Sequence, residues 1–201
     1  PMLQPPPAPR ADWCLFLDFD GTLVELRDHP DEVEAPCSLG PLLDRVLAAF
    51  GGAVAIVSGR SVAGLEALLA PLELPLAGIH GLERRDAQGV YHRSGDREQL
   101  RPVMTAVGDF VASRPGLHWE DKGGAVALHY RGAPERAEEV RGFLEDQRAR
   151  LGERYHLQRG KAVFELKPAD RDKGRVVADF MGEPPFAGRT PVFVGDDVTD
   201  E

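Results

Sequence analysis

Short runs of consecutive apolar residues alternate with segments of helical periodicity in the first part of the chain. The apolar runs at 13–17, 53–57 and 76–79 are typical of strands buried on both faces of a parallel sheet. Between these runs, apolar residues recur at helical spacing over 39–50, and a second helix is predicted over 61–70. This alternation of strand and helix predicts a parallel α/β core with right-handed crossovers.

The middle of the chain follows a different order, in which a helix and then a hairpin occur twice. Helical periodicity extends over 99–113 and again from Pro134 to residue 151. Each helix precedes two strand-like segments around a glycine-containing turn, at 122–124 and at 160–161. The order predicts an inserted domain with an open antiparallel sheet and helices on one face. Another hairpin turn is predicted earlier, at Asp86-Ala-Gln-Gly89.

The parallel pattern returns near the end of the sequence, with a helix over 173–181 and an apolar strand over 191–194. We therefore predict an α/β protein in which a parallel-sheet core is interrupted by an inserted α/β cap. The expected division is a flexible, proline-rich leader at 1–11, a core at 12–82 and 168–201 that continues beyond residue 201, and a cap at 83–167.

Composition and charge exclude several classes of function. The 33 acidic residues outnumber the 24 basic ones, the net charge is -9 and no basic stripe occurs, so we expect no nucleic-acid partner. No apolar run reaches the roughly 18–20 residues that a membrane-spanning helix needs, so we expect no membrane partner. The N-terminal segment lacks the pattern of a signal peptide, and the two cysteines form no disulfide or metal pattern. We therefore expect a cytoplasmic monomer.

Polar residues follow three of the predicted parallel strands. Asp18 and Asp20 follow the first strand, Ser58 and Arg60 the second, and Asp196-Asp197 the last. Because ligands bind at the carboxyl ends of strands in such sheets, we expect these groups to meet. Clustered carboxylates raise one another's pKa or require a cation. Oxygen donors without a Cys/His cluster favour Mg²⁺ as that cation, with Asp18, Asp20 and Asp196 as its ligands. Since Mg²⁺ commonly completes its coordination with phosphate and water, the cluster predicts phosphoryl chemistry.

These residue types match the parts that phosphoryl transfer needs. Asp18 can act as the nucleophile and form an aspartyl-phosphate. Asp20 can protonate the departing alcohol and then deprotonate water. Ser58 can hold a phosphate oxygen together with backbone N–H groups. Lys173, one of few lysines in an arginine-rich chain, can neutralise the phosphate and keep Asp18 ionised.

Three further residues near the carboxylates are candidates for phosphate binding. Gly21 gives the backbone room to turn directly after Asp20, and Thr22 adds a hydroxyl group and an N–H group. Arg60 has two possible roles, because it could assist with the phosphate or pair with an acid on the surface. The sequence alone leaves these two roles of Arg60 open.

Several short segments of the sequence resemble known phosphatase motifs. Asp18-Phe-Asp-Gly-Thr22, Ser58, Lys173 and Gly195-Asp-Asp197 resemble the four motifs of the haloacid dehalogenase superfamily of aspartate-nucleophile phosphatases. Over residues 14–201 the chain is also similar to one family within it, the trehalose-6-phosphate phosphatases. The words that carry this second similarity are Ser58-Gly-Arg60, His80-Gly81, Leu128-His-Tyr-Arg131, Glu165-Leu-Lys-Pro168 and Gly195-Asp-Asp-Val-Thr-Asp-Glu201.

The resemblance implies a Rossmann-like core, an inserted α/β cap, Mg²⁺, and hydrolysis of the small-molecule substrate trehalose 6-phosphate to trehalose and phosphate. It also implies that Asp20 binds the metal through its backbone carbonyl. On the cap, Glu120, Lys122 and Glu165 match positions that grip the sugar, and their carboxylate and ammonium groups suit sugar hydroxyls. His80 is a further substrate-binding candidate near the junction of core and cap, as are Glu83 and Arg84.

Two other interpretations remain at this point. The substrate could be another sugar phosphate, such as a sucrose-phosphate type. The chain could also be a non-catalytic, phosphatase-like regulatory module, although such a module would be expected to lack a catalytic carboxylate or the motif lysine. The remaining five histidines, His129 among them, follow no ligand spacing, so we expect surface or structural roles for them.

Overall fold

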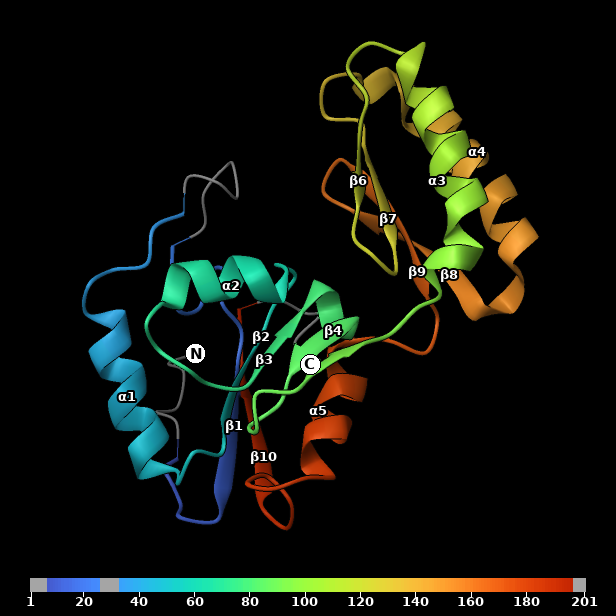
Figure 1. The fold of residues 1–201 in the computed structure, drawn as a ribbon. Coiled ribbons are helices and arrows are strands. Elements are labelled where there is room, and N and C mark those ends of the chain that lie inside the picture. The colour runs from blue at the N-terminus through green and yellow to red at the C-terminus, as the bar shows by residue number, and fades with distance from the viewer. Residues whose placement is uncertain (1–6, 26–32, 197–201) are drawn as a thin grey trace.

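The computed structural model describes residues 7–25 and 33–196, which form two sheets with separate sets of helices (Figure 1). The strands of the first sheet are β1 (Trp13–Leu17), β2 (Val54–Val57), β3 (Leu76–Gly78), β4 (Glu83–Arg85), β5 (Tyr91–Arg93) and β10 (Thr190–Val194). Their order across the sheet is β10-β1-β2-β3-β4-β5. Strands β10, β1, β2 and β3 are parallel to one another, which confirms the predicted parallel α/β core.

Helices cover both faces of the parallel strands (Figure 1). Helices α1 (Leu39–Ala49) and α2 (Val62–Leu69) pack on the face that holds Leu17. Helix α5 (Lys173–Met181) packs on the opposite face, against Phe16. Because neighbouring side chains of a strand point to opposite faces, both faces must be apolar, and this explains the uninterrupted apolar run of β1.

Residues 83–93 form an antiparallel hairpin that extends the core sheet. Strand β4 pairs with β3 and β5 pairs with β4, both in antiparallel orientation. The hairpin turn predicted at 86–89 is confirmed, and the Asp86 carboxylate stabilises it by accepting from the Val90 N–H at 2.8 Å. The cap was expected to begin at residue 83, but this boundary is too early. The edge of β3 offers unpaired N–H and C=O groups, and the hairpin satisfies them.

The inserted cap has its own antiparallel sheet and its own core. Its elements are α3 (Arg97–Ala112), β6 (His118–Asp121), β7 (Val126–His129), α4 (Ala137–Leu151), β8 (Tyr155–Gly160) and β9 (Val163–Pro168). The strand order is β6-β7-β9-β8, with every pair antiparallel. Both helices lie on the same side of this sheet, where Val107 and Leu144 contact Leu128 and Leu166 (Figure 1). The predicted open sheet with helices on one face is therefore confirmed.

Two segments, 94–96 and 169–172, connect the core and the cap. No helix in the described part of the chain is long and apolar enough to cross a membrane. Residues 1–6, most of the predicted leader, lie outside the described residues, as do Asp197 of the last motif and the expected continuation beyond residue 201.

Candidate active site

Three acidic or hydroxyl-bearing segments meet at the carboxyl end of the parallel strands. Strand β1 lies between β2 and β10, so the chain that leaves β1 enters the crevice where ligands bind in such sheets. Leu17 at the end of β1 lies opposite Val194 of β10, and the Asp18 N–H donates to the Val194 carbonyl at 2.9 Å. Asp18, Ser58 and Asp196 thus follow three adjacent strands, as the sequence predicted.

Asp18 and Lys173 form a buried ion pair. The Lys173 Nζ lies 2.9 Å from Asp18 Oδ1, and the two side chains are 10% and 9% exposed. Asp172 fixes the start of α5, because its side chain accepts from the Arg175 N–H at 2.7 Å and so caps the helix. This helix-capping hydrogen bond holds Lys173 in the first turn of α5. There the Lys173 ammonium pairs with the Asp18 carboxylate, which would be costly to bury alone.

Asp20 has a different partner from Asp18. The Arg60 guanidinium donates to both Asp20 carboxylate oxygens, with Nε 2.8 Å from Oδ2 and Nη2 2.7 Å from Oδ1. Of the two roles considered for Arg60, the structure therefore shows pairing with an acid, and that acid is Asp20 of the site. Gly21 at φ 88° turns the chain directly after Asp20, and this turn separates the surroundings of the two carboxylates.

The turn that contains Gly21 and Thr22 packs directly on Asp196. A Cβ atom at Gly21 would lie 2.3 Å from Asp196 Oδ2, so no residue with a side chain fits there. Thr22 Oγ1 donates to Asp196 Oδ1 at 3.5 Å. These contacts bring the acid that follows β10 against the turn that follows β1, although 174 residues separate Thr22 from Asp196.

Ser58 lies inside the turn between β2 and α2. Its side chain is 1% exposed, and its Oγ accepts from the Arg60 N–H at 3.1 Å. Ser61 caps α2 by accepting from the Gly64 N–H at 3.1 Å. The hydroxyl of Ser58 therefore supports the turn, and Ser58 is not among the residues that line the adjacent cavity.

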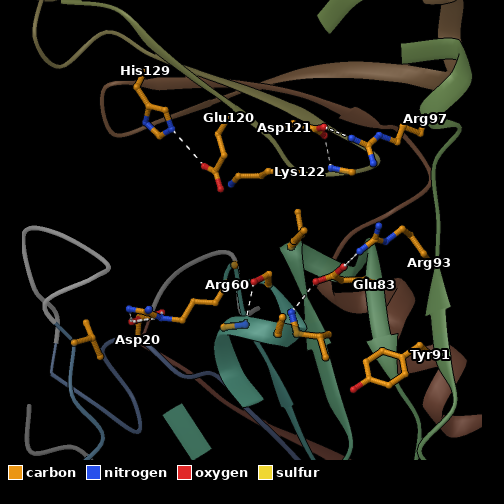
Figure 2. A pocket seen from close by; sticks show the side chains of 18 residues that line it. Asp20, Arg60, Glu83, Tyr91, Arg93, Arg97, Glu120, Asp121, Lys122 and His129 are labelled. Atoms are coloured by element: carbon orange, nitrogen blue, oxygen red, sulfur yellow. Dashed lines mark hydrogen bonds and ion pairs between the residues drawn. The ribbon is translucent and has the colours of Figure 1, made fainter. Parts of the chain in front are cut away.

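A cavity of about 850 Å³ lies between the core and the cap. Asp20 and Arg60 contribute to its core wall, and Glu120, Lys122 and His129 face them from the cap (Figure 2). The cavity is therefore lined by the predicted acid/base on one side and by predicted sugar-binding residues on the other.

The three predicted sugar-binding residues form two separate groups. Lys122 Nζ lies 2.6 Å from Glu165 Oε1, and both side chains are 13% exposed. Burial opposes ionisation of Glu165, but the adjacent Lys122 ammonium outweighs it, so the pKa of Glu165 is lowered. Glu120 is 52% exposed and lies 3.7 Å from His129 Nε2, and His129 lowers the pKa of Glu120. Glu165 reaches the cavity only through Lys122, since Glu165 itself is not a lining residue.

His80 does not line the cavity either. Its ring packs on Gly59, because a Cβ atom at Gly59 would lie 2.8 Å from two of the ring atoms. His80 therefore lies behind the turn that carries Ser58 and Arg60.

Sequence reasoning missed several residues that line the cavity, among them His129, Arg93 and Arg97. Arg93 binds the Glu83 carboxylate at 2.8 Å, and Arg97 binds Asp121 at 2.6 Å (Figure 2). Strand register could have indicated two of the three. Glu83 pairs directly with Arg93 across the 86–89 hairpin. His129 pairs with His118, two residues before Glu120 on the same face of β6.

The described residues offer oxygen donors that suit a hard cation. In residues 7–25 and 33–196, no three His, Cys, Asp or Glu side chains gather closely enough to hold a metal ion. The carboxylates that follow β1 and β10, those of Asp18 and Asp196, are oxygen donors at the carboxyl end of the sheet. Mg²⁺ is usually bound by one or two carboxylates together with water and substrate phosphate, so this donor set fits Mg²⁺.

Comparisons with known proteins agree with this geometry. The sequence model of the family described as trehalose-phosphatase matches residues 16–201. A probable trehalose-phosphate phosphatase of Sinorhizobium fredii is 46% identical over 94% of this chain and 72% of its own length. The trehalose-6-phosphate phosphatase of Escherichia coli is 43% identical over 95% of this chain and 72% of its own length.

A solved structure shows the same architecture. The crystal structure of a trehalose-6-phosphate phosphatase related protein superposes with a TM-score of 0.72 at 26% identity, covering 93% of this chain and 79% of that one. The predicted resemblance to the trehalose-phosphatase family is confirmed. The chain therefore belongs to the trehalose-phosphatase family of phosphomonoester hydrolases.

Proposed function

We propose that this enzyme hydrolyses trehalose 6-phosphate to trehalose and phosphate, with Mg²⁺ and through an aspartyl-phosphate on Asp18. The observation that carries the proposal is the buried Asp18–Lys173 pair at the carboxyl end of β1. Neither residue of the pair lines the cavity, but Asp20, two residues after Asp18, does, opposite the polar wall of the cap. The names of the relatives from S. fredii and E. coli support the choice of sugar. The cytoplasmic location and the monomeric state stay predictions.

In the first step, a carboxylate oxygen of Asp18 attacks phosphorus and the bond from phosphorus to the sugar oxygen breaks. Asp20 gives a proton to the departing sugar oxygen. Because both Asp20 oxygens bind Arg60, this carboxyl group must exchange Arg60 for the sugar oxygen when the substrate enters. Arg60 then becomes available to the phosphate, which offers the oxygens that guanidinium prefers.

In the second step, water attacks the phosphorus of the aspartyl-phosphate. Asp20 takes the proton of that water, the bond between Asp18 and phosphorus breaks, and inorganic phosphate leaves with the Asp18 carboxylate restored. Lys173 stays beside Asp18 throughout and compensates its charge whenever the carboxylate is free. The N–H groups of the turn after β2 can hold the phosphate oxygens.

The cation is assigned to Asp18, Asp196 and the Asp20 carbonyl. When bound, Mg²⁺ supplies charge neutralisation for the phosphoryl oxygens. The contact of the Gly21–Thr22 turn with the Asp196 carboxylate supports the assignment of this residue.

A substrate panel tests the proposed activity. Phosphate release would be measured with trehalose 6-phosphate, sucrose 6-phosphate and a small aryl phosphate, each with Mg²⁺ and with excess chelator. We expect the highest kcat/KM for trehalose 6-phosphate, and loss of activity in chelator that added Mg²⁺ restores. A preference for sucrose 6-phosphate would change the substrate assignment, and full activity in excess chelator would contradict the assignment of Mg²⁺.

Replacement of the nucleophile tests the covalent mechanism. We expect Asp18→Asn to lower kcat at least roughly a thousandfold on every substrate, because an amide cannot attack phosphorus as a carboxylate does. The variant keeps nearly the same side-chain shape, so circular dichroism should show an intact fold. Phosphate release near the wild-type rate would contradict the aspartyl-phosphate.

A further inference from the structure

Two consecutive non-glycine residues are left-handed in the short turn that follows β3. Ile79 has φ 50° and His80 has φ 52°, within the 3₁₀ turn Ile79–Gly81. Left-handed backbone is uncommon outside glycine and is an outlier for a β-branched residue such as isoleucine. Such a conformation persists only where the surrounding contacts determine it, and these strained residues tend to occur at functional sites.

One side of this turn holds the loop that carries Ser58 and Arg60. The Ile79 N–H donates to the Arg60 carbonyl at 2.8 Å, and the His80 N–H donates to the Ser58 carbonyl at 3.1 Å. The His80 ring lies against Gly59, where a Cβ atom would come within 2.8 Å of it. The strained conformation therefore serves to fix the loop that is proposed to hold the phosphate.

The other sides of the turn contact the start of helix α5, which carries Lys173, and the cap. A Cβ atom at Gly81 would lie 2.6 Å from the Asp172 carbonyl, which begins the helix that carries Lys173. Ile79 and Leu82 form a small buried apolar cluster with Ala125 of the cap hairpin. The same hairpin carries Lys122, whose N–H donates to the Ala125 carbonyl at 3.0 Å. A single turn thus contacts the phosphate loop, the start of α5 and the sugar-binding hairpin.

Charged groups of both domains act on the side chain of His80. Glu165, Lys122 and Lys167 of the cap act on it electrostatically, and so does Lys173 of the core. Burial lowers the pKa of His80 to about 4, so the ring is neutral at pH 7. A neutral ring on the Gly59 side of the junction adds nothing to the positive charge of the three lysines.

We propose that His80 is a positioning residue that sets the Lys122–Glu165 pair relative to the phosphate loop of residues 58–60. His80 does not line the cavity and acts through the groups that it contacts. The inference rests on the proposed function, because it assigns the sugar to Lys122 and Glu165 and the phosphate to the core. It predicts that His80 matters for substrates that occupy both domains and matters little for substrates that occupy only the core.

A substrate comparison combined with a double-mutant cycle tests this role. In His80→Asn the side chain is shortened, and asparagine tolerates the left-handed backbone. We expect kcat/KM for trehalose 6-phosphate to fall about tenfold or more, and kcat/KM for a small aryl phosphate to change less than about threefold. In a Lys122→Ala background the same replacement should cost little more, because coupled residues are not additive.

Equal losses on both substrates would mean that His80 only supports the phosphate loop, and additive losses in the cycle would separate it from Lys122. Either result would overturn the proposal. His92→Asn is the matched control, since His92 binds Asp86 at the turn of the β4–β5 hairpin and does not line the cavity. It should leave both substrates near wild type.

A second variant approaches the junction from the cap. Ala125 is 2% exposed, and Ala125→Gly loosens its contact with Ile79 and Leu82 without touching the phosphate loop. We expect Ala125→Gly to lower kcat/KM for trehalose 6-phosphate by less than His80→Asn does, and to leave kcat/KM for the aryl phosphate nearly unchanged. If Ala125→Gly left kcat/KM for trehalose 6-phosphate unchanged, the proposal would be contradicted even if His80→Asn failed to fold. If wild-type enzyme preferred another sugar phosphate, the substrate assignment would fail, and the same comparison would be made with that ester.

Discussion

The core and the cap each contain buried ion pairs, but the two domains build them from different parts of the fold. In the core, Asp18 and Lys173 are 155 residues apart and meet because parallel strands end side by side. In the cap, Lys122 and Glu165 are 43 residues apart and lie on hairpins of one antiparallel sheet. The core pair therefore depends on the whole α/β topology, and the cap pair depends on the packing of two hairpins.

The two domains also differ in how completely they bury their charges. The Asp18 side chain is 9% exposed, while Glu120, one of the expected sugar ligands, is 52% exposed. Bond-breaking at phosphorus requires groups that are fixed before the substrate arrives, because reorganisation during the reaction costs rate. Sugar hydroxyls, in contrast, exchange water for protein partners one at a time and tolerate a partly solvated surface.

The largest effect is expected when the core pair is broken. Removing one partner of a buried ion pair leaves an uncompensated charge and costs about 3–5 kcal/mol of unfolding free energy. We therefore expect Lys173→Met to lower the unfolding free energy by that amount, as measured by urea denaturation. Adding Asp18→Asn should restore most of the loss, because the buried carboxylate charge is then absent. Equal stability of Lys173→Met and wild type would show that Asp18 is solvated and would remove the contrast with the cap.

The second prediction concerns pH and the residue between the two domains. The pKa of His80 is lowered from 6.5 to about 4 by burial, so the unfolded chain binds a proton that the folded protein does not bind between these pH values. The contribution of neutral His80 to stability is fully present above pH 6.5 and is lost as the pH falls toward 4. Each pKa unit corresponds to about 1.4 kcal/mol, so up to about 3 kcal/mol is lost over this range.

Urea denaturation at several pH values, with wild type and His80→Asn, measures this contribution. As the pH falls from 6.5 to 4, the unfolding free energy of the wild type should fall more than that of His80→Asn. Parallel curves for wild type and His80→Asn would show that the ring is hydrated and does not link the domains.

The periodicity of the sequence was sufficient for the core sheet, the cap sheet and the helices between them. The apolar run of 13–17 and the helical spacing of 39–50 depend on burial alone, and burial follows directly from side-chain type. The boundary at residue 83 could not be predicted in the same way. Glu83-Arg-Arg85 is polar, and only the unpaired edge of β3 explains why it joins the core sheet.

Some residues of the site could likewise be predicted from the sequence, and others could not. Asp18, Lys173 and Asp196 could be placed because each one follows a strand end or begins a helix. The pairing of Arg60 with Asp20 depends on where the chain turns after Gly21, and side-chain direction in a turn has no sequence period. The place of His80 behind Gly59 depends on two left-handed residues that no local preference of Ile79 or His80 would suggest.

The third prediction separates the domains by substrate. Lys122→Ala removes a charged hydrogen-bond donor, which typically contributes about 1.5–3 kcal/mol, so kcat/KM for trehalose 6-phosphate should fall roughly ten- to a hundredfold. A small aryl phosphate has no sugar for the cap, and its kcat/KM should change little. Lys161→Ala is the matched control, because Lys161 is an exposed lysine at the other hairpin turn of the cap. Equal losses on both substrates would show that Lys122 supports the fold or the phosphate site.

The smallest effect is expected within the cap itself, where the two glutamates differ in exposure. Glu120 is 52% exposed and lies 3.7 Å from His129 Nε2, so water competes for its interactions with a sugar, and exposed charges typically contribute about 0.2–1 kcal/mol. Glu120→Gln should therefore lower kcat/KM for trehalose 6-phosphate by no more than roughly fivefold. Glu165 is 13% exposed and compensates Lys122 at 2.6 Å, so Glu165→Gln should cost more, because it leaves the lysine charge poorly paired. Measuring kcat/KM of both variants on both substrates shows which of the two carboxylates contributes more to sugar recognition. If Glu120→Gln were the more damaging change, sugar recognition would depend on the open wall of the cavity, and the buried pair would serve only to hold the hairpins together.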